Sequence, residues 1–298
     1  MSIKILVVGG TGMLGKPVAD RMANDGYKVR VMTHSPEKAK IMFGSEIELA
    51  AGDVTKPGGL IEAVRGCDGV YISLSAKMNP DNYELIERRG TADVARAAAE
   101  EGIKHIAMIS GLNVGTADPN IPMYRAKIGA EKALIDSGIP YTIFRCSWFF
   151  ESLPLFVVGK RAMVFGRQRH TQSWLAASDY AAMVSKAFSI NGARNKIFHI
   201  RGIEKFSIPE ALKKFCQIVF PKVKIRHVPI WMLSTIGSVT RNKNMKGLAQ
   251  FLRFFEKNPE SDVNGEAERI LGPALTTLRD WAEEYKKRVS GESRTESD

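Results

Sequence analysis

One stretch near the start of the sequence limits the choice of fold more than any other. Residues 5–8 form an unbroken aliphatic run, which is typical of a parallel strand buried on both faces. Glycines follow at positions 9, 10, 12 and 15, and a helical pattern of apolar residues comes next. A strand, a glycine turn and a helix in this order predict a dinucleotide-binding βαβ unit. The alternative is an ordinary glycine turn of an α/β protein.

Each glycine of this turn has its own predicted task. Gly9 or Gly10 permits the tight turn, Gly12 lets a pyrophosphate approach the backbone, and Gly15 lets the helix pack close to the strand. The N–H groups at the start of the helix, together with the helix dipole, would face the phosphates. The predicted cofactor-binding residues of the turn are Gly9, Thr11, Gly12, Met13, Leu14 and Gly15.

The end of the second predicted strand, residues 28–32, bears on which cofactor binds. In NAD-binding folds of this kind, an acidic residue about twenty positions beyond the glycines binds the ribose hydroxyls. No acid stands at this strand end, where His34, Ser35 and Lys38 are found instead. Such donors can hold a 2′-phosphate that an acid would repel, so we predict that NADP(H) is favoured over NAD(H). Taken alone, Lys38 is better explained by a solvated helix face. Further cations near this strand end are Lys16, Arg30 and Lys40.

Two later strand ends add candidates to the same edge of the sheet. Strands are predicted over 48–51 and 69–73, and ligands of open α/β sheets bind outside the carboxyl ends of the strands. Asp53 can accept a hydrogen bond from the adenine amino group, or it can instead cap the next helix. The predicted cofactor-binding residues here are Asp53, Val54, Ser73, Leu74 and Ser75.

The alternation of strands and helices continues over about two thirds of the chain and predicts an α/β fold with a doubly wound parallel sheet of about seven strands. The remaining strands are expected over 105–109, 141–145 and 196–201. Helices are expected over 13–25, 57–64, 82–101, 123–136 and 178–188, the last of them capped by Ser178-Asp179. The C-terminal third is expected to contain a strand at 224–228 and helices at 207–219, 231–240, 246–255 and 276–289.

The net charge is strongly positive, +11 at pH 7. Such a balance favours anionic partners, but no basic run is interleaved with aromatic residues, so we expect no nucleic acid partner and favour a solvated basic surface. The densest basic zones, 213–214, 222–226 and 241–246, lie in the C-terminal third. A protein partner or a membrane surface at this basic C-terminal region is the alternative.

The cysteines and the hydropathy indicate a cytoplasmic protein. Cys67, Cys146 and Cys216 are far apart in apolar surroundings and are expected to be reduced core residues, without the spacing of a metal site. No segment contains the roughly 18 consecutive apolar residues that a membrane-spanning helix needs, so no transmembrane segment is predicted.

Gly9, Gly12 and Gly15 have the GxxGxxG spacing of the short-chain dehydrogenases and reductases. Further motifs lie in segments 127–145, 148–151, 174–187 and 271–281. Together these motifs resemble the NmrA-like atypical group of that superfamily. The resemblance is good over residues 3–202 and thin afterwards. It implies a seven-stranded Rossmann domain, a small C-terminal substrate domain and NAD(P)(H) binding.

The expected domain boundaries follow from this resemblance. We predict an NAD(P)-binding Rossmann domain over 1–202, with an excursion over 148–175 toward the substrate domain. A small C-terminal α/β substrate domain is expected over 203–289, followed by a disordered tail over 290–298. The aromatic residues Trp148, Phe149 and Phe150 would either line a pocket for an aromatic substrate or pack between the two domains.

The resemblance also identifies catalytic candidates and one departure from the family pattern. Short-chain dehydrogenases use Tyr-x-x-x-Lys, in which the ammonium lowers the pKa of the Tyr, together with a Ser at the end of the fifth strand. Lys127 and Ser110 match this pattern, but Met123 occupies the Tyr position. Tyr124 can reach the site if the helix start is irregular. The catalytic candidates are therefore Lys127, Ser110 and Tyr124, and Lys127 is also expected to bind the nicotinamide ribose.

Each of these candidates has an alternative role, and so does the whole chain. Ser110 can make a strand-end hydrogen bond, and Tyr124 can pack inside or face solvent. The first functional hypothesis is an NADP(H)-preferring reductase of a small carbonyl or quinone-like substrate. The second is a non-catalytic NmrA-like sensor that binds NADP(H) and regulates a protein partner, which the missing Tyr favours. A sugar-nucleotide epimerase is disfavoured because Met123 replaces the Tyr that such enzymes use.

Overall fold

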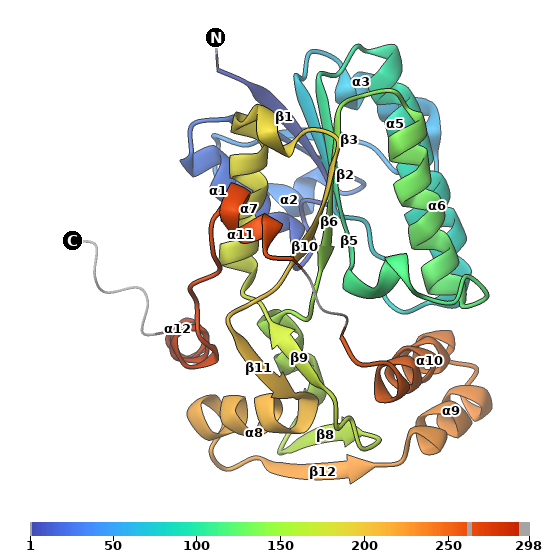
Figure 1. Ribbon diagram of the computed structural model, residues 1–298, viewed down its shortest axis with the longest axis vertical. Helices are drawn as coiled ribbons and strands as arrows, with labels where there is room; N and C mark the ends of the chain where they lie inside the picture. The colour runs from blue at the N-terminus through green and yellow to red at the C-terminus, as the bar shows by residue number, and fades with distance from the viewer. Residues whose placement is uncertain (1, 261–263, 292–298) are drawn as a thin grey trace. The chain divides into compact units, whose positions relative to one another are not determined.

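The computed structural model describes residues 2–260 and 264–291, in which the chain forms two compact units (Figure 1). Within the described residues, the first unit contains 2–146, 180–200 and 264–273, and the second contains 147–179, 201–260 and 274–291. Each unit is thus built from three stretches of the chain. The expected 148–175 excursion lies in the second unit, and the division into domains 1–202 and 203–289 stays a prediction.

The first unit is built on a seven-stranded sheet in which every neighbouring pair of strands is parallel. Its order is β10-β6-β5-β4-β1-β2-β3. The strands are β1 (Lys4–Val8), β2 (Lys28–Thr33), β3 (Glu48–Ala51), β4 (Gly69–Ile72), β5 (His105–Gly111), β6 (Tyr141–Cys146) and β10 (Lys196–Ile200). The chain reverses its direction of winding between β1 and β4, where Rossmann sheets bind their ligands. The predicted doubly wound parallel sheet is confirmed.

Helices cover both faces of this sheet. Figure 1 shows α1 (Gly15–Asn24) and α7 (Ala177–Ser189) on one face and α5 (Gly90–Glu100) and α6 (Pro122–Asp136) on the other. Residues 5–8 of β1 are fully buried, as their continuous aliphatic run predicts. The shorter helical elements of the unit are α2 (Pro36–Met42), η1 (Pro57–Gly59), α3 (Leu60–Val64), α4 (Pro80–Asn82), η3 (Leu112–Gly115), η5 (Asn191–Ala193) and α11 (Glu266–Leu271).

The helix expected over 82–101 is not a single α-helix. A π-helical segment, η2 (Tyr83–Arg89), lies between α4 and α5. The wider turn of a π-helix changes which side chains face the sheet, and η2 buries Tyr83 and Glu87. A seven-residue stretch is too short for hydrophobic periodicity to distinguish a π-helix from an α-helix, so the sequence carries no clear signal of it.

The second unit combines two small sheets with helices. Strands β9 (Thr171–Trp174) and β11 (Glu204–Ser207) form an antiparallel pair, and the other sheet has the order β12-β8-β7. An aromatic cluster of Phe150, Trp174, Phe215 and Trp281 fills its core. The remaining elements are η4 (Phe150–Phe156), β7 (Val157–Val158), β8 (Arg161–Phe165), α8 (Ile208–Val219), β12 (Lys224–Val228), α9 (Ile230–Val239), α10 (Lys243–Lys257) and α12 (Leu278–Ser290).

Local contacts explain several elements of this unit. Helix α8 begins with a capping box, in which Ser207 and Glu210 exchange hydrogen bonds between side chain and backbone. Asp179 was expected to cap α7, but that prediction is wrong. Its carboxylate instead accepts the backbone N–H groups of Leu275 and Thr276 at 2.9 and 2.8 Å.

The end of the chain agrees only in part with the prediction. Helix α12 runs through Ser290, so the expected disordered tail over 290–298 does not begin at that residue, and positions 292–298 lie outside the described residues. The three cysteines are free thiols, two of them buried. Across 2–260 and 264–291, every helix is too short or too polar to cross a bilayer.

Candidate functional site

The glycine turn joins β1, β4 and α1 through two approaches that only glycine allows. Gly9 has a φ of +82°, and a Cβ atom there would lie 2.3 Å from the carbonyl oxygen of Ser73 at the end of β4. A Cβ atom on Gly15 would lie 2.1 Å from the carbonyl oxygen of Gly9. Both distances are shorter than any real contact, so a side chain at either position would force the backbone apart. These approaches hold the start of α1 against the carboxyl end of β1.

Gly12 differs from these two glycines because a Cβ atom there would make one tight contact but no severe clash. It is exposed, and a Cβ atom there would come within 4 Å only of the Gly9 carbonyl oxygen, at 3.2 Å. Helix α1 begins without a side-chain cap on its N-terminal N–H groups and without an acid in its first turn. Uncapped N–H groups and the positive end of a helix dipole suit an anion such as a pyrophosphate. The residues present therefore fit a dinucleotide.

The other predicted residues of the turn lie around the exposed Gly12 and the start of α1. Met13 exposes 48% of its surface, although it is a large apolar residue, and Thr11 and Leu14 are half-buried. The backbone N–H of Ser73 donates to the carbonyl of Val8, so Ser73 lies beside the turn at the neighbouring strand end. Ser75 lies further along, where its hydroxyl accepts the backbone N–H of Lys77 at 3.2 Å.

The residues beyond β2 differ in whether their side chains already have a hydrogen-bond or ion-pair partner. Ser35 Oγ lies 2.8 Å from His34 Nδ1, both near the start of α2. Lys38 is exposed and has no ion-pair partner among residues 2–260 and 264–291. Three nearby cations are already engaged. Arg30 binds Glu48 and two backbone carbonyls, Lys40 pairs with Glu37, and Lys16 pairs with Asp20 and lies over the ring of Phe43.

Asp53 is held in a tight turn beyond β3. Its Oδ1 accepts the backbone N–H and the hydroxyl of Thr55 at 2.9 and 2.8 Å, and these bonds lower the pKa of the Asp53 carboxyl. Asp53 does not cap the next helical segment, since Lys56 occupies that position. Its second oxygen, Oδ2, has no hydrogen bond within the described chain. Val54 is 9% exposed and packs with Leu74 in the core of the unit.

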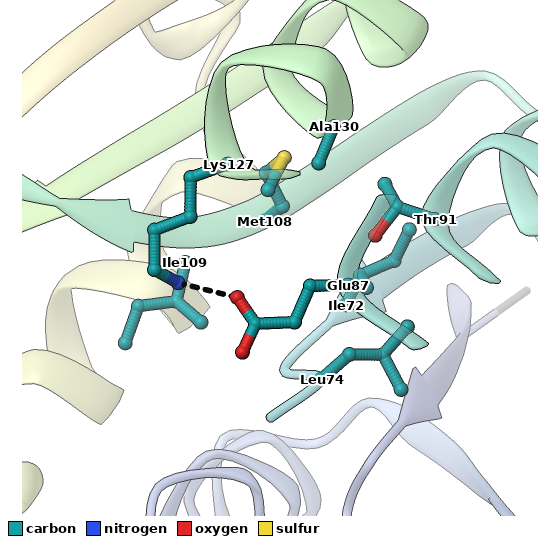
Figure 2. Close-up of a pocket in the computed structure, with 8 residues that line it drawn as sticks. All are labelled: Ile72, Leu74, Glu87, Thr91, Met108, Ile109, Lys127 and Ala130. Carbon is teal, nitrogen blue, oxygen red and sulfur yellow. Dashed lines mark ion pairs between the residues drawn. The ribbon is translucent and has the colours of Figure 1, made fainter. Parts of the chain in front are cut away.

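Lys127 forms an ion pair that the sequence analysis did not anticipate. Its ammonium lies 3.1 Å from Oε2 of Glu87, and Figure 2 shows the two side chains pointing toward one another. Glu87 is only 7% exposed, and its Oε1 accepts the backbone N–H of Ala76 at 2.8 Å. One buried carboxylate therefore binds both the α6 lysine and the loop that follows β4.

A small cavity of about 10 Å³ adjoins this ion pair, which is roughly the space of one water molecule. Its walls come from β4, β5, α5 and α6, and its lining is otherwise mostly apolar: Ile72, Leu74, Thr91, Met108, Ile109 and Ala130 (Figure 2). The Lys127 side chain is 21% exposed, so solvent or a ligand can reach part of it. An ammonium held in place on a partly exposed side chain can donate a hydrogen bond to a polar oxygen.

The sequence offered little to identify Glu87. It stands among Glu84, Arg88 and Arg89, a composition typical of a solvated helix face. Glu84 does behave that way, since it is partly exposed and pairs with Arg88 and Arg89. The π-helical geometry of η2 separates the two acids by turning Glu87 inward. An acid four residues from the buried Tyr83 was the only available signal.

Ser110 lies at the end of β5, as predicted, but its hydroxyl is already engaged. Ser110 Oγ donates to Oε1 of Glu131 at 2.6 Å, and the same carboxylate accepts from Arg145 Nε and Nη2 at 3.0 and 2.6 Å. Ser110 is 4% exposed and Glu131 is 5% exposed. This geometry fits the strand-end hydrogen bond that was the alternative role for Ser110.

Tyr124 is buried in the first turn of α6. Helix α6 is regular from Pro122 onward, so the irregular start that would bring Tyr124 to the site is not present. The side chain is 2% exposed, and burial raises the pKa of its phenol well above the ordinary value, as does the nearby Tyr83. Met123 is buried too, at 8% exposure. Of the three catalytic candidates, Lys127 is the one that is partly open.

The aromatic residues that follow β6 belong to the second unit. Trp148 packs against Phe251 and Phe255, and Phe150 stacks on Trp174 and Trp281. Phe149 is 8% exposed. Phe150 therefore contributes to the core of that unit, and only Trp148 keeps part of its surface accessible.

Comparisons with known proteins agree with this geometry. A family model described as NAD(P)H-binding matches residues 9–174. The photosystem II assembly factor Ycf39 of Trieres chinensis is 25% identical over 250 residues, which cover 80% of this chain and 76% of that protein. A (4-alkanoyl-5-oxo-2,5-dihydrofuran-3-yl)methyl phosphate reductase of Streptomyces griseus is 25% identical over 295 residues, covering 97% of this chain and all of that protein.

Solved structures share the fold at low sequence identity. The NADPH complex of a quinone oxidoreductase from Escherichia coli superposes with a TM-score of 0.76 at 21% identity, covering 94% of this chain and 99% of that one. At this identity the likeness concerns the fold.

Proposed function

The chain belongs to the NAD(P)H-binding family, and from this premise we propose that it is an NADPH-dependent reductase of a small carbonyl or quinone-like substrate. One observation carries the proposal. The uncapped start of α1 and the partly exposed side chain of Lys127 both lie in the first unit, each on a helix that follows a strand of the parallel sheet. The first suits a pyrophosphate, and the second suits a ribose or substrate oxygen.

We assign a separate role in cofactor binding or proton donation to each residue of the site. The N–H groups around Gly12 would bind the pyrophosphate, and Asp53 would accept the adenine amino group through its Oδ2. Lys127 Nζ would donate to the nicotinamide ribose and to the substrate oxygen that gains a proton. Bound NADPH would supply the hydride. Glu87 would act as a positioning residue, because its buried carboxylate fixes where the ammonium lies.

The absence of the usual Tyr favours a hydride acceptor whose reduction depends little on a general acid. A quinone delocalises the charge it gains over a conjugated ring, so its reduction demands less from a general acid than the reduction of a simple ketone. The similar proteins named above include a reductase of an oxo-dihydrofuran phosphate and a quinone oxidoreductase, and both names support a conjugated acceptor. We propose the same class for this chain.

The preference for NADP(H) is also a proposal. Donors where an NAD-binding fold would have an acid come from Ser35, His34 and Lys38, the last without an ion pair in the part of the chain that the structure describes. A cytoplasmic location is proposed as well, in keeping with three free cysteines.

Two measurements test the proposed function. Fluorescence titration of the purified protein with NADPH and NADH gives the two affinities, and we expect micromolar binding with NADPH the tighter ligand. Oxidation of NADPH is then followed by absorbance across a panel of quinones and aldehydes, with Lys127→Met as the matched variant. Turnover that Lys127→Met lowers by at least about tenfold supports the reductase, by analogy with the loss of one general acid. If no acceptor is reduced above the buffer rate, the reductase proposal fails.

A second function is favoured by the burial of Tyr124 and by Met123 at the Tyr position. We propose as the alternative a sensor that binds NADP(H) and regulates a protein partner. Tight cofactor binding without turnover, and a partner whose affinity changes when NADPH replaces NADP, would support the sensor. A chain that binds neither nucleotide would exclude both functions.

A further inference from the structure

Helix α9 of the second unit exposes an apolar surface that the described residues of the unit leave uncovered. Trp231, Met232, Ile236 and Val239 are 62, 37, 44 and 79% exposed, although each is a large apolar residue. Met232, Ile236 and Val239 follow one another at helical spacing, and Trp231 lies beside them. The ten residues of α9 contain no charged side chain. An uncharged, exposed helix of this kind is unusual on a monomeric protein.

Basic residues precede and follow this apolar helix along the chain. Lys222, Lys224 and Arg226 precede it on the chain, and β12 runs into α9 with only Pro229 between them. Arg241, Lys243 and Lys246 follow it, in the turn and the first part of α10. All six of these side chains are exposed. Residues 207–257 contain ten Lys and Arg residues but only two Glu residues, a balance of +8 out of the net charge of +11 for the protein.

A basic hollow adjoins the start of α9. It has a volume of about 580 Å³ and is lined by Gly166, Arg167, Arg169, His227, Val228 and Pro229. The two arginines and the histidine are exposed. The neighbouring carboxylate of Glu256 accepts the backbone N–H of Arg167 at 2.5 Å and is therefore engaged. The hollow offers a cationic recess large enough for a phosphate-bearing group, directly beside the apolar helix.

We propose that this end of the second unit, comprising α9, its flanking basic residues and the hollow, docks onto a lipid bilayer that contains anionic lipids. Trp231, Met232, Ile236 and Val239 would enter the interface between headgroups and acyl chains. The basic residues would remain at the level of the headgroup phosphates, and Arg167 and Arg169 would bind one headgroup in the hollow. The reductase proposal does not depend on this surface.

The arrangement of charge favours a bilayer over a protein partner. A helix that lies in the membrane interface has an apolar face with Trp near the headgroups and cations at its borders, and it gains from both apolar burial and anionic lipid. Basic residues before and after α9, with none within it, follow that order. Ten residues span only about 15 Å as a helix, so α9 would lie on the membrane and not cross it.

Vesicle sedimentation tests the proposal with the full-length protein. Vesicles of phosphatidylcholine alone are compared with vesicles that contain about 30% phosphatidylserine, at low and high salt. We expect binding to the anionic vesicles, weak binding to the neutral ones, and a loss on the order of tenfold at high salt. Soluble glycerophosphate is added in a separate arm. Its binding to a protein that does not sediment with vesicles would overturn the docking surface.

Two sets of variants assign the binding to α9. Trp231→Ser/Val239→Ser removes two side chains that are more than half exposed, and Leu155→Ser, at 73% exposure, is the matched apolar control. Arg241→Ser/Lys243→Ser/Lys246→Ser is compared with Lys286→Ser/Lys287→Ser on α12. We expect each α9 set to weaken anionic-vesicle binding by about tenfold or more while its control binds normally.

Fluorescence and oligomeric state complete the test. Among the four tryptophans, Trp231 is the most exposed, so we expect a blue shift of emission on binding that Trp231→Phe abolishes. The proposal is overturned if anionic vesicles do not bind, or if the α9 variants bind as the wild type does. It is also overturned if the protein is a dimer that Trp231→Ser/Val239→Ser converts to a monomer, since a second copy would then cover α9.

Discussion

The ammonium of Lys127 lies 3.1 Å from Oε2 of Glu87, while the other oxygen of the same carboxylate accepts the backbone N–H of Ala76. The pair joins α6 to the loop beyond β4 through one side chain of a π-helical segment. Removing the charge of Glu87 would leave the lysine without its buried partner. The lysine therefore has a carboxylate as its charged neighbour, whereas the family pattern would place a Tyr beside it.

The first prediction separates the two bonds of Glu87. Glu87→Gln keeps an oxygen for the Ala76 amide but removes the charge beside Lys127, so we expect kcat/KM with NADPH to fall by about tenfold with little change in stability. Glu87→Ala also leaves the Ala76 amide unpaired, and we expect a further loss of about 2 kcal/mol in the free energy of unfolding. Steady-state kinetics and urea unfolding measure the two effects.

Glu84→Gln is the control for this pair, because Glu84 lies on the same segment but is partly exposed and pairs with arginines. It should leave both kcat and the KM for NADPH close to the wild-type values. Equal kinetics for Glu87→Gln and Glu84→Gln would reduce Glu87 to a structural residue.

The second prediction contrasts two glycines of the turn. A Cβ atom on Gly12 would lie 3.2 Å from the Gly9 carbonyl oxygen, which a shift of a few tenths of an ångström relieves, and an acid near a helix N-terminus is favourable to the helix. Because these two effects oppose one another, Gly12→Asp should change the melting temperature little, while its charge repels the pyrophosphate and weakens NADPH binding by about a hundredfold. Gly15→Ala places a methyl group against the Gly9 carbonyl and should lower the free energy of unfolding by about 3 kcal/mol. Thermal unfolding and NADPH titration of both variants check this, and a destabilised Gly12→Asp protein with normal NADPH affinity would contradict it.

The parts of the fold that sequence could predict are those set by short-range patterns. The aliphatic run of residues 5–8 gave a buried strand, and the positions of Gly9 and Gly15 gave the turn, because each depends on neighbours a few residues away. The strand at 224–228 and the helix near 231–240 were placed correctly for the same reason.

The parts that sequence could not predict depend on contacts between distant segments. In the sequence, Glu87 resembles a solvent-facing acid. Its buried position depends on the π-helical geometry of η2 and on Lys127, which lies on a helix forty residues later. Ser110 matches the family serine by position, but only the fold brings Glu131 and Arg145 to its hydroxyl. Asp179 stands at the start of a helix and so resembled a helix cap. Its partners, the amides of residues 275 and 276, are almost a hundred positions away in the sequence and leave no local signal.

The third prediction concerns the 2′-phosphate. Lys38 is exposed and unpaired within the described residues, so Lys38→Glu should weaken NADPH binding by about tenfold and leave NADH binding almost unchanged. Lys40→Glu is the matched control, because Lys40 lies on the same helix but pairs with Glu37. The measured quantity is the dissociation constant for NADH divided by that for NADPH, which Lys38→Glu should lower. If Lys38→Glu and Lys40→Glu lower this ratio equally, the effect is one of general charge and not of a phosphate contact.

The fourth prediction compares the two residues that the family pattern offers for proton transfer. Tyr124 is buried and its phenol has a raised pKa, so Tyr124→Phe should leave kcat within about twofold of the wild type. Lys127→Met should lower kcat/KM by at least about tenfold, since Lys127 is the proton donor whose side chain is partly exposed. The same acceptor and saturating NADPH are used for both. Strong loss in Tyr124→Phe, with a normal melting temperature, would assign the phenol to catalysis.

The last prediction concerns stability and pH. Burial and, to a smaller extent, the guanidinium of Arg194 lower the pKa of His105 from 6.5 to about 4. His105 Nε2 lies 2.9 Å from Thr142 Oγ1, whose own proton is donated to the carbonyl of Ala193, so the neutral imidazole donates to Thr142. The neutral form is the one that the fold favours.

Because the folded-state pKa lies below the unfolded one, the unfolded chain binds a proton first as the pH falls. The contribution of His105 is thus complete above pH 6.5 and is lost between pH 6.5 and 4, at up to about 1.4 kcal/mol per pH unit. Urea unfolding across this range should show a smaller slope for His105→Gln, whose amide can still donate to Thr142. His227→Gln, an exposed histidine on β12, should keep the wild-type slope. Parallel curves for the wild type and His105→Gln would show that His105 titrates alike in both states.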